Sequence, residues 1–443
     1  MKAYDNYKQS HVDWIGEIPN NWSITKLKFI SNIYNGNSLN DDLKEKFESE
    51  DLNNITYIGT KDVEQDTGKI NLENGIRIPK NEGNFRIAPK GSFVLCIEGG
   101  SAGKKIGYLN EDVYFVNKLA CFDYENKFLY YYVLSDHFKN QFFNSLSGLI
   151  GGVSISLIRN FYSTFPSKNE QIQIASFLDY KTNLIDATIE KKKHLIELLK
   201  EKRQAVINEA VTKGLNPNAP IKDSGVEWLG EIPEHWGLVP LRYLYNKIGS
   251  GVTPKGGGDV YTDEGVTFIR SQNVHFDGLR LDDVVKIDIE THQKMNNSSV
   301  EFNDVLLNIT GASIGRCCVV NIDEEMNVNQ HVCIIRVNER IKPDFLNIVL
   351  QSNVGQTQIK LLTTGGNREG LTQEAVKNMS IPLPNIETQI QLLNSITEKL
   401  KSFDLIKNKI ETAIEKLQTY RQSLISEAVT GKIDVRDWEK VKN

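Results

Sequence analysis

Apolar residues recur at alternating spacings of three and four along two long segments of the chain, which is the pattern of a helix that packs against another helix. The spaced positions run over residues 175–210 in the first segment and 393–428 in the second. Both interiors lack proline and glycine, and Gly214 and Gly431 follow as stop signals. The seam includes Leu178, Ile185, Leu199, Ile396, Leu417 and Leu424. The pattern predicts two long helices with seams in the same register.

A long helix with one apolar seam exposes that seam unless a partner covers it. A helix over residues 170–212 would be roughly 65 Å long, whereas the linker from Gly214 to Pro220 reaches only about 25 Å when extended. The chain must therefore reach the second helix through the intervening block. This favours an antiparallel coiled coil with a block at each end, related by an approximate two-fold axis. Docking of each helix on its own block would also cover part of the seam.

The segments outside the helices alternate strand-like runs with glycine-rich turns, as at 91–97 and 305–309. Helical stretches follow late in each block, at 127–144 and 343–362. We expect an α+β fold in which each block is an α/β-sheet domain. The expected boundaries are a first block at 1–165, a first long helix at 166–215, a second block at 216–383, a second long helix at 384–431 and a tail at 432–443.

The chain is also a tandem repeat. Ser-x-Val-x-Trp-x-Gly-Glu-Ile-Pro-x-x-Trp begins at Ser10 and returns at Ser224, so Trp14 and Trp22 recur as Trp228 and Trp236. Arg-Gln with Ile-x-Glu-Ala-Val-Thr closes the first half from position 203 and the second half from position 421. Two matches at nearly one offset indicate two halves that begin and end alike. We interpret the tryptophans as structural, because such residues pack well against proline.

The middles of the two halves agree only in outline. Similar places are occupied by Tyr57-Ile58 and Phe268-Ile269, by Val116-Asn117 and Val328-Asn329, and by the glycine-rich stretches 99–104 and 311–316. The remaining residues differ. Similar framing around dissimilar middles suggests one scaffold that displays two different binding surfaces.

The glycine-rich stretches have two possible interpretations. They resemble phosphate-binding loops, because backbone amides stand beside a cation, and they are equally compatible with ordinary hairpin turns. Other segments carry side chains of the types that read guanine and adenine edges. The candidate DNA-binding residues are Lys61, Lys104, Lys105, Arg270, Gln272, Asn273, Arg316, Asn367 and Arg368.

Composition narrows the class of protein. Hydrophobic residues make up 40% and charged residues 25%, which is typical of a globular chain. The net charge of −5 does not indicate nucleic-acid binding, although a local basic surface remains compatible with it. The five cysteines form no Cys-x-x-Cys pair, so we expect reduced, buried thiols. No apolar run reaches the roughly 18 residues of a membrane span, and we expect a cytoplasmic protein.

The motifs of several enzyme classes are absent. We find no tetrapeptide of the Asn-Pro-Pro-Tyr or Asp-Pro-Pro-Phe kind, with which amino-methyltransferases hold an extruded base. Gly-x-Gly-x-x-Gly, the Walker loop and His-Glu-x-x-His are also absent. The seven histidines are scattered, without the spacing of metal ligands. We therefore expect no catalysis and no metal site in this chain.

The duplicated opening and closing motifs, the two helices and the dissimilar middles together resemble the specificity subunits of type I restriction–modification systems. The resemblance covers almost the whole chain. It implies that each block is a target recognition domain for one half of a bipartite double-stranded DNA site. It also implies that the helices dock modification subunits, two per complex, which hold S-adenosylmethionine and methylate adenine, and that restriction subunits join them.

Two other classes compete with this interpretation. The chain could be a fragment of a catalytic methyltransferase or nuclease, which the missing motifs disfavour. It could also be a coiled-coil adaptor without a DNA role, which would enrich no sequence from a random DNA pool.

Overall fold

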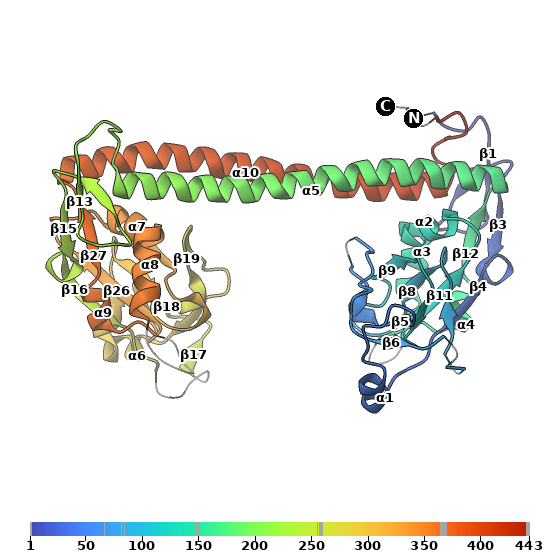
Figure 1. Cartoon of the computed structure of the whole chain (residues 1–443), viewed down its shortest axis with the longest axis horizontal. Helices are drawn as coiled ribbons and strands as arrows, with labels where there is room; N and C mark the ends of the chain where they lie inside the picture. Colours follow the sequence, from blue (N-terminus) through green and yellow to red (C-terminus); the bar gives the residue numbers. More distant parts are fainter. Residues whose placement is uncertain are drawn as a thin grey trace. The chain divides into compact units, whose positions relative to one another are not determined.

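The computed structural model divides into two compact units. Unit 1 comprises Met1–Lys192 with Glu411–Asn443, and unit 2 comprises Lys193–Ile410. The structure describes residues 2–65, 67–80, 82–83, 85–146, 151–254, 256, 260–363 and 370–439. Each unit contains one of the two expected blocks together with one end of each long helix (Figure 1).

The strands of unit 1 are short. They are β1 (Tyr7–Gln9), β2 (Glu17–Pro19), β3 (Ser23–Lys26), β4 (Asn32–Asn35), β5 (Ile55–Ile58), β6 (Arg77–Ile78), β7 (Ile87–Ala88), β8 (Phe93–Cys96), β9 (Ile106–Tyr108), β10 (Val113–Phe115), β11 (Leu119–Asp123) and β12 (Tyr162–Phe165). Its helices, apart from the long ones, are η1 (Leu27–Phe29), α1 (Asp41–Lys46), η2 (Thr60–Asp62), α2 (Phe128–Leu134), α3 (Asp136–Asn144) and α4 (Ile155–Ile158).

Two four-stranded sheets form the body of unit 1, in the orders β4-β11-β8-β9 and β6-β5-β10-β7. Strand β8 is buried on both faces. Successive side chains of a strand point to opposite sides of the sheet. Phe93 and Leu95 belong to the core beneath the helices, whereas Val94 and Cys96 belong to the core between the sheets. Burial on both faces explains why this strand is apolar throughout.

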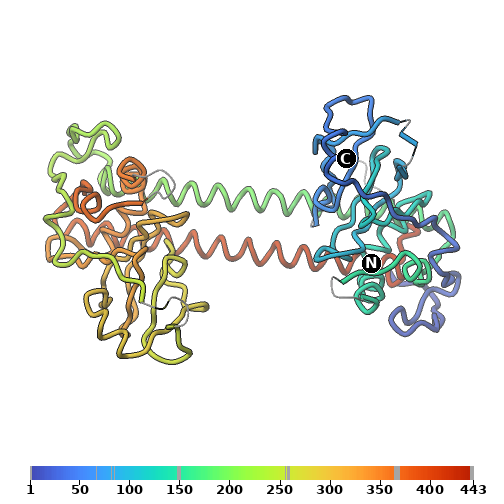
Figure 2. Tube along the Cα trace, turned by 90° about the horizontal axis from the view of Figure 1, so that it is seen from below, coloured from blue at the N-terminus to red at the C-terminus, as the bar shows by residue number. Residues whose placement is uncertain are grey.

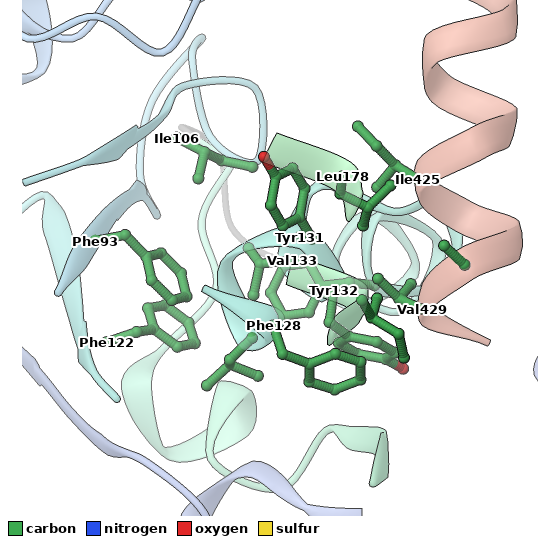
Figure 3. Packing of buried hydrophobic residues seen from close by; sticks show 14 of the residues in the cluster. Phe93, Ile106, Phe122, Phe128, Tyr131, Tyr132, Val133, Leu178, Ile425 and Val429 are labelled. Carbon is green, nitrogen blue, oxygen red and sulfur yellow. The ribbon is translucent and has the colours of Figure 1, made fainter. Parts of the chain in front are cut away.

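Helix α2 lies between the first sheet and the long helices. Figure 3 shows Phe93 and Phe122 of the sheet on one side, Ile425 and Val429 of the second long helix on the other, and Phe128 of α2 in the space between. All five side chains are at most 1% exposed. The core of unit 1 is therefore shared by the sheet, the short helices and the ends of the long ones.

Unit 2 repeats this plan, with five strands instead of four in one of its two main sheets. Its strands are β13 (Ile221–Asp223), β14 (Glu231–Pro233), β15 (Gly237–Pro240), β16 (Tyr245–Ser250), β17 (Tyr261–Thr262), β18 (Val266–Ile269), β19 (Val274–His275), β20 (Gly278–Leu279), β21 (Val285–Ile287), β22 (Ser299–Val300), β23 (Val305–Asn308), β24 (Cys317–Val319), β25 (Met326–Val328), β26 (Val332–Val337) and β27 (Ser380–Leu383). Its short helices are η3 (Leu241–Tyr243), η5 (Ser271–Asn273), α6 (Ile289–Lys294), η6 (Asn296–Ser298), η7 (Gly311–Ser313), α7 (Pro343–Gln351), α8 (Asn353–Leu362) and α9 (Gln373–Lys377).

The two sheets of unit 2 have the orders β16-β26-β23-β24 and β17-β21-β18-β25-β22. Strand β25 runs parallel to β18, as β10 runs parallel to β5 in unit 1. Val305 and Leu307 of β23 belong to the core beneath the helices, and Leu306 belongs to the core between the sheets. The two blocks therefore share one sheet scaffold despite their dissimilar sequences.

The helical stretches expected at 127–144 and 343–362 are each two helices rather than one. Ser135 separates α2 from α3 with an extended backbone (φ −71°, ψ 158°), and its hydroxyl accepts a hydrogen bond from the backbone N–H of Phe138. Ser352 separates α7 from α8 in the same way and caps α8 at Gly355. A serine that caps the second helix of each pair explains the break.

The two long helices are α5 (Lys168–Thr212) and α10 (Ile386–Val429). They lie side by side in each unit (Figures 1 and 2). In unit 1 they run antiparallel, because Gln173 donates to the carbonyl of Trp438 beyond α10, whereas Asp186 pairs with Arg421 earlier along α10. The Arg421 guanidinium reaches Asp186 through two nitrogens, at 2.8 and 3.2 Å.

The expected seam residues differ in burial. Leu178, Ile185, Ile396 and Leu424 are at most 7% exposed, whereas Leu199 and Leu417 are only half-buried. In unit 1, Leu178 and Ile185 share a cluster with Leu424. In unit 2, Ile207 of α5 shares a cluster with Ile396 of α10. The seam is therefore driest where the helices also cover a block.

The opening and closing motifs of the sequence meet in space. Gly431 ends α10 with φ +73°, and a Cβ there would stand 2.4 Å from Pro19 and 3.3 Å from Trp22. Gly214 follows α5 with φ +75°, and a Cβ there would stand 3.2 Å from Trp236. Each helix of one half therefore ends on the tryptophan motif of the other half, and only glycine suits both the backbone angle and the space.

The structural interpretation of the tryptophans applies unevenly. Trp22 and Trp236 are at most 1% exposed, and Trp22 has edge contacts with the rings of Tyr4 and Phe128. Trp228 packs partly against the core of unit 2. Trp14 is 46% exposed, so packing of the kind expected does not account for it.

The segment expected as a tail packs against the rest of unit 1. Ile433 and Val435 are buried, and the backbone N–H of Asp434 donates to the carbonyl of Lys2 at 2.8 Å. The ring of Trp438 meets that of Phe177 edge-on at 5.4 Å. Residues 432–438 thus pack against the first turns of α5, where Trp438 contacts Phe177 and accepts a hydrogen bond from Gln173.

We expect Leu178→Ala to lower the free energy of unfolding by about 2–5 kcal/mol, because it leaves a cavity in a closed core. Leu184→Ala in the same helix is the matched control, since Leu184 is 55% exposed and should change stability by no more than about 0.5 kcal/mol. Urea denaturation of both variants measures the difference. Equal losses would contradict the packing described for α5.

We expect Trp22→Ala to cost about 3–5 kcal/mol, because this ring fills the junction between the end of α10 and the sheet. Trp14→Ala in the same motif should change the stability by about 0.5 kcal/mol or less. Thermal unfolding of the two variants tests the contrast. A destabilising Trp14→Ala together with a neutral Trp22→Ala would refute it.

Candidate nucleic-acid interface

Three strands of unit 1 end at one edge, and the loops that follow them are joined by backbone hydrogen bonds. The N–H of Val116, after β10, donates to the carbonyl of Ile58 in β5 at 3.0 Å. The N–H of Ile97, after β8, donates to the carbonyl of Lys118 at 2.9 Å. A fourth segment joins where Val153 donates to Ile97 at 3.0 Å. We call residues 59–62, 97–105, 116–118 and 151–153 the strand-end loops of unit 1.

Unit 2 builds the same framework at the ends of β18, β23 and β25. Asn329 donates to the carbonyl of Ile269 at 3.0 Å, and Ile309 donates to that of His331 at 2.9 Å. Leu371 in turn donates to Ile309 at 2.7 Å. The strand-end loops of unit 2 are residues 270–273, 309–316, 329–331 and 370–371.

These hydrogen bonds correct the alignment of the two halves. Tyr57-Ile58 and Phe268-Ile269 are equivalent, as expected, because each pair lies in the strand parallel to β10 or β25. Val116 corresponds to Asn329, however, and not to Val328, because these are the residues that donate to Ile58 and Ile269. The second half carries two extra residues between β24 and β25, because residues 320–325 connect these strands whereas residues 109–112 connect β9 to β10. Its glycine-rich turn is one residue shorter, since Asn308 donates to the carbonyl of Arg316 where Cys96 donates to that of Lys105. The net shift is therefore one residue, which the Val-Asn pair common to both halves concealed.

The strand-end loops contain all three predicted DNA-binding residues of unit 1. Lys61 and Lys104 are exposed, and the Lys104 ammonium donates to the carbonyl of Gly100 at 3.2 Å. The half-buried Lys105 donates to the carbonyl of Thr60 at 2.8 Å and so holds the loop after β5 against the glycine-rich turn. Lys105 therefore links two loops, whereas the contact of Lys104 lies within its own turn and Lys61 is exposed.

In unit 2 the equivalent positions hold Gln272 in place of Lys61 and the single residue Arg316 in place of Lys104-Lys105, because the carbonyl of Arg316 accepts from Asn308 as that of Lys105 accepts from Cys96. Gln272 is exposed, and its amide donates to the carboxylate of Asp283 at 3.3 Å. Arg316 is partly exposed. Arg270 donates to the carbonyl of Asp283 at 3.2 Å and lies over the ring of Tyr261. A basic side chain after the glycine-rich turn is thus common to both units.

The prediction for Asn273 is corrected by its environment. Its side chain is 2% exposed, its amide oxygen accepts from the N–H of Arg270 at 3.0 Å, and its amide nitrogen donates to the carbonyl of Arg280 at 2.9 Å. Asp62 makes the same contact in unit 1, where its carboxylate accepts from the N–H of Gly59 at 2.8 Å. This position fixes the loop and is closed to a base. Asn367 and Arg368 lie outside the described residues.

The sequence-based choice of candidates missed two pairs of side chains in these loops. The Lys118 ammonium lies 3.7 Å from the Glu98 carboxylate in unit 1. At the equivalent positions of unit 2, the hydroxyl of Thr310 lies 2.5 Å from Nδ1 of His331. A signal was present, since Glu98 and Thr310 stand two residues after β8 and β23, and Lys118 and His331 directly precede β11 and β26. The one-residue misalignment hid the equivalence of Lys118 and His331.

The thiols are packed as small apolar groups, which agrees with the expectation of free, buried cysteines. Burial raises the pKa of all five above the ordinary value, to about 11 for Cys121 and about 12 for Cys318 and Cys333; the other two are Cys96 and Cys317. A thiol with so high a pKa stays protonated at neutral pH and is a poor nucleophile or metal ligand.

Within the described residues, no group of three or more histidine, cysteine, aspartate or glutamate side chains is placed to hold a metal ion. Nor does any helix among those residues combine the length and the apolar composition that crossing a bilayer requires. The polar side chains of the strand-end loops are donors and acceptors on a firm backbone, which suits recognition of a polar surface.

Comparison with known proteins identifies several relatives. The type I restriction enzyme EcoBI specificity subunit of Escherichia coli is 28% identical over 323 residues, which cover 70% of this chain and 66% of that subunit. The MjaVIII specificity subunit of Methanocaldococcus jannaschii is 27% identical over 79% of this chain and 81% of its own length. The putative MjaX specificity subunit of the same organism is 27% identical over 98% of this chain.

Solved structures show the same fold at lower identity. A chain from a study of complex assembly and conformational transition in the type I restriction–modification system matches with a TM-score of 0.71 at 15% identity, over 94% of this chain and 99% of that one. The HsdS subunit of Thermoanaerobacter tengcongensis matches with a TM-score of 0.50 at 15% identity, over 94% of this chain and 98% of its own.

The family model for the type I restriction modification DNA specificity domain matches residues 19–198 and again residues 233–417. Together the two matches cover most of the chain, with one match in each half of the tandem repeat. The chain therefore belongs to the family of type I restriction modification DNA specificity domains.

Proposed function

We propose that this chain is the non-catalytic specificity subunit of a type I restriction–modification complex, and that each unit is a target recognition domain for one half of a bipartite double-stranded DNA site. The observation that carries the proposal is the duplicated loop framework. The two units hold their strand-end loops with equivalent backbone hydrogen bonds, yet they present different side chains there. A common scaffold with unlike polar edges is what two unlike half-sites require.

The charges of the loops support this role. Lys61, Lys104 and Arg316 are cationic groups that can contact phosphates, and such contacts supply most of the affinity for DNA. The net charge of −5 over the whole chain opposes DNA binding at long range. Binding by the isolated chain is therefore weak in this proposal, and partner subunits strengthen it.

The exposed faces of the long helices are the surfaces proposed for docking. Helix α5 exposes Leu184, Leu195 and Leu198, and α10 exposes Leu405 and Ile406, all by more than 40%. Apolar side chains on a helix surface are typical of a surface that another helix covers. The partners proposed are two modification subunits, which hold S-adenosylmethionine and methylate adenine in the cytoplasm, and restriction subunits that join them.

The first test is methylation by the full chain in complex with its modification subunits. We expect sequencing of methylated sites to give one motif with two specified halves and an unspecified gap. Replacing residues 216–383 with the matching block of a relative should change one half of the motif and leave the other half as it was. The purified chain alone should transfer no methyl group. A motif rewritten in both halves by the replacement would refute separate reading.

The second test concerns docking. Leu195→Glu with Leu198→Glu places two charges on the exposed face of α5, and we expect it to weaken association with the modification subunit by roughly 30-fold or more. Leu52→Glu is the control, since Leu52 is 81% exposed in a loop of unit 1. Thermal unfolding of both variants should match the parent chain. Undiminished co-purification of the α5 variant would exclude this face.

A further inference from the structure

The Glu98–Lys118 and Thr310–His331 pairs occupy the same two places on the shared framework. Glu98 forms an isolated antiparallel bridge with Gly152, and Thr310 forms one with Gly370. The carbonyl of Lys118 accepts from Ile97, and that of His331 accepts from Ile309. The backbone is thus equivalent, and only the side chains differ.

The Glu98–Lys118 pair is not needed to stabilise the fold. The side chains are 44% and 48% exposed, and the closest nitrogen–oxygen distance is 3.7 Å. Exposed ion pairs of this kind contribute little to stability. Unit 2 holds the same backbone without an ion pair, since Thr310 and His331 stand there with the threonine hydroxyl oxygen 2.5 Å from Nδ1 of the histidine. The chemistry at these positions is therefore free to vary with the ligand.

The charged pair matches one kind of base pair. In the major groove a G·C pair presents the acceptors N7 and O6 of guanine beside the amino donor of cytosine. An ammonium donates to the guanine acceptors, and a carboxylate accepts from the cytosine amino group. Lys118 and Glu98 offer this donor and this acceptor side by side, while the nearby ammonium groups of Lys61 and Lys104 can contact phosphates.

The corresponding pair of unit 2, Thr310 with His331, holds neither a carboxylate nor an ammonium group. The exposed Gln330 adjoins the pair, with its amide nitrogen 3.1 Å from Nε2 of His331. A glutamine amide pairs with the N6 and N7 edge of adenine, and a threonine hydroxyl can contact either kind of base pair. The chemistry of unit 2 therefore does not repeat the preference of unit 1.

We propose that these two positions, 98 and 118 in unit 1 and 310 and 331 in unit 2, determine sequence specificity, and that Glu98 with Lys118 selects a G·C pair in the half-site that unit 1 reads. This inference rests on the proposed function of the chain. It adds to that function the residues that choose the base and the base pair that one of the two edges takes.

The test transfers the pair from one unit to the other. In the full chain with its modification subunits, Glu98→Thr with Lys118→His should remove the G·C preference at one position of one half-site, by roughly five- to 150-fold. The other half-site should stay unchanged in methylated-site sequencing. The reciprocal change, Thr310→Glu with His331→Lys, should introduce a G·C preference into the other half-site.

The control variants distinguish a loss of base recognition from a general effect of charge or of misfolding. Lys46→His with Glu82→Thr makes the same chemical change in another exposed ion pair of unit 1 (3.0 Å), and it should leave the motif intact. Lys118→Arg keeps a donor for guanine and should keep the G·C preference. If the parent complex gives a two-part motif that both transfer variants leave unaltered, the assignment of these positions is overturned. If the parent complex gives no two-part motif, the proposed function itself fails.

Discussion

The last turns of α10 complete the hydrophobic core of the first block, and this exchange underlies the rest of the fold. Leu424, Ile425 and Val429 belong to the same cluster as Trp22 and Phe128, although some 300 or more residues separate them along the chain. In unit 2, Ile207 and Val211 at the end of α5 perform the equivalent task. Each block therefore depends on a helix that belongs to the other half of the sequence.

This exchange explains why the opening and closing motifs are the best-preserved parts of the repeat. Gly431 and Gly214 must end their helices against Pro19 and Trp236, which leaves no space for a Cβ atom. In each unit, the opening motif of one half packs against the closing motif of the other half. The loops at the far ends of the strands meet no such demand, which leaves their side chains free to differ between the halves.

The sequence predicted what depends on local chemistry. The long helices follow from the apolar spacing, and their ends follow from glycine, so α5 and α10 begin and end close to the expected residues. The breaks at Ser135 and Ser352 were missed, because the apolar pattern continues across a serine that caps the next helix. Strand order depends on pairing between distant segments such as β5 and β10, which periodicity does not encode.

The strand-end loops were predictable only in part, for a related reason. Lys104 was predicted because it ends a glycine-rich turn, and it lies with the predicted Lys61 in the strand-end loops. Asn273 has the same side-chain chemistry as a base-reading residue. Its amide oxygen and nitrogen, however, are already hydrogen-bonded to the backbone of Arg270 and Arg280. Glu98 and Lys118 lie twenty residues apart in sequence, so only the pairing of β8 with β11 shows that they form a pair.

The exchanged helix ends also constrain how the chain acquires its structure on the ribosome. The first block and the beginning of α5 have been synthesised once Lys192 has been added to the growing chain. The part of α10 that covers them starts only at Glu411. At the usual rate of roughly 5–20 residues per second, the intervening segment takes on the order of tens of seconds to make. During that interval Phe128, Leu178 and their neighbours lack their final cover. The nascent first half therefore keeps part of its apolar surface uncovered until the end of α10 has been made.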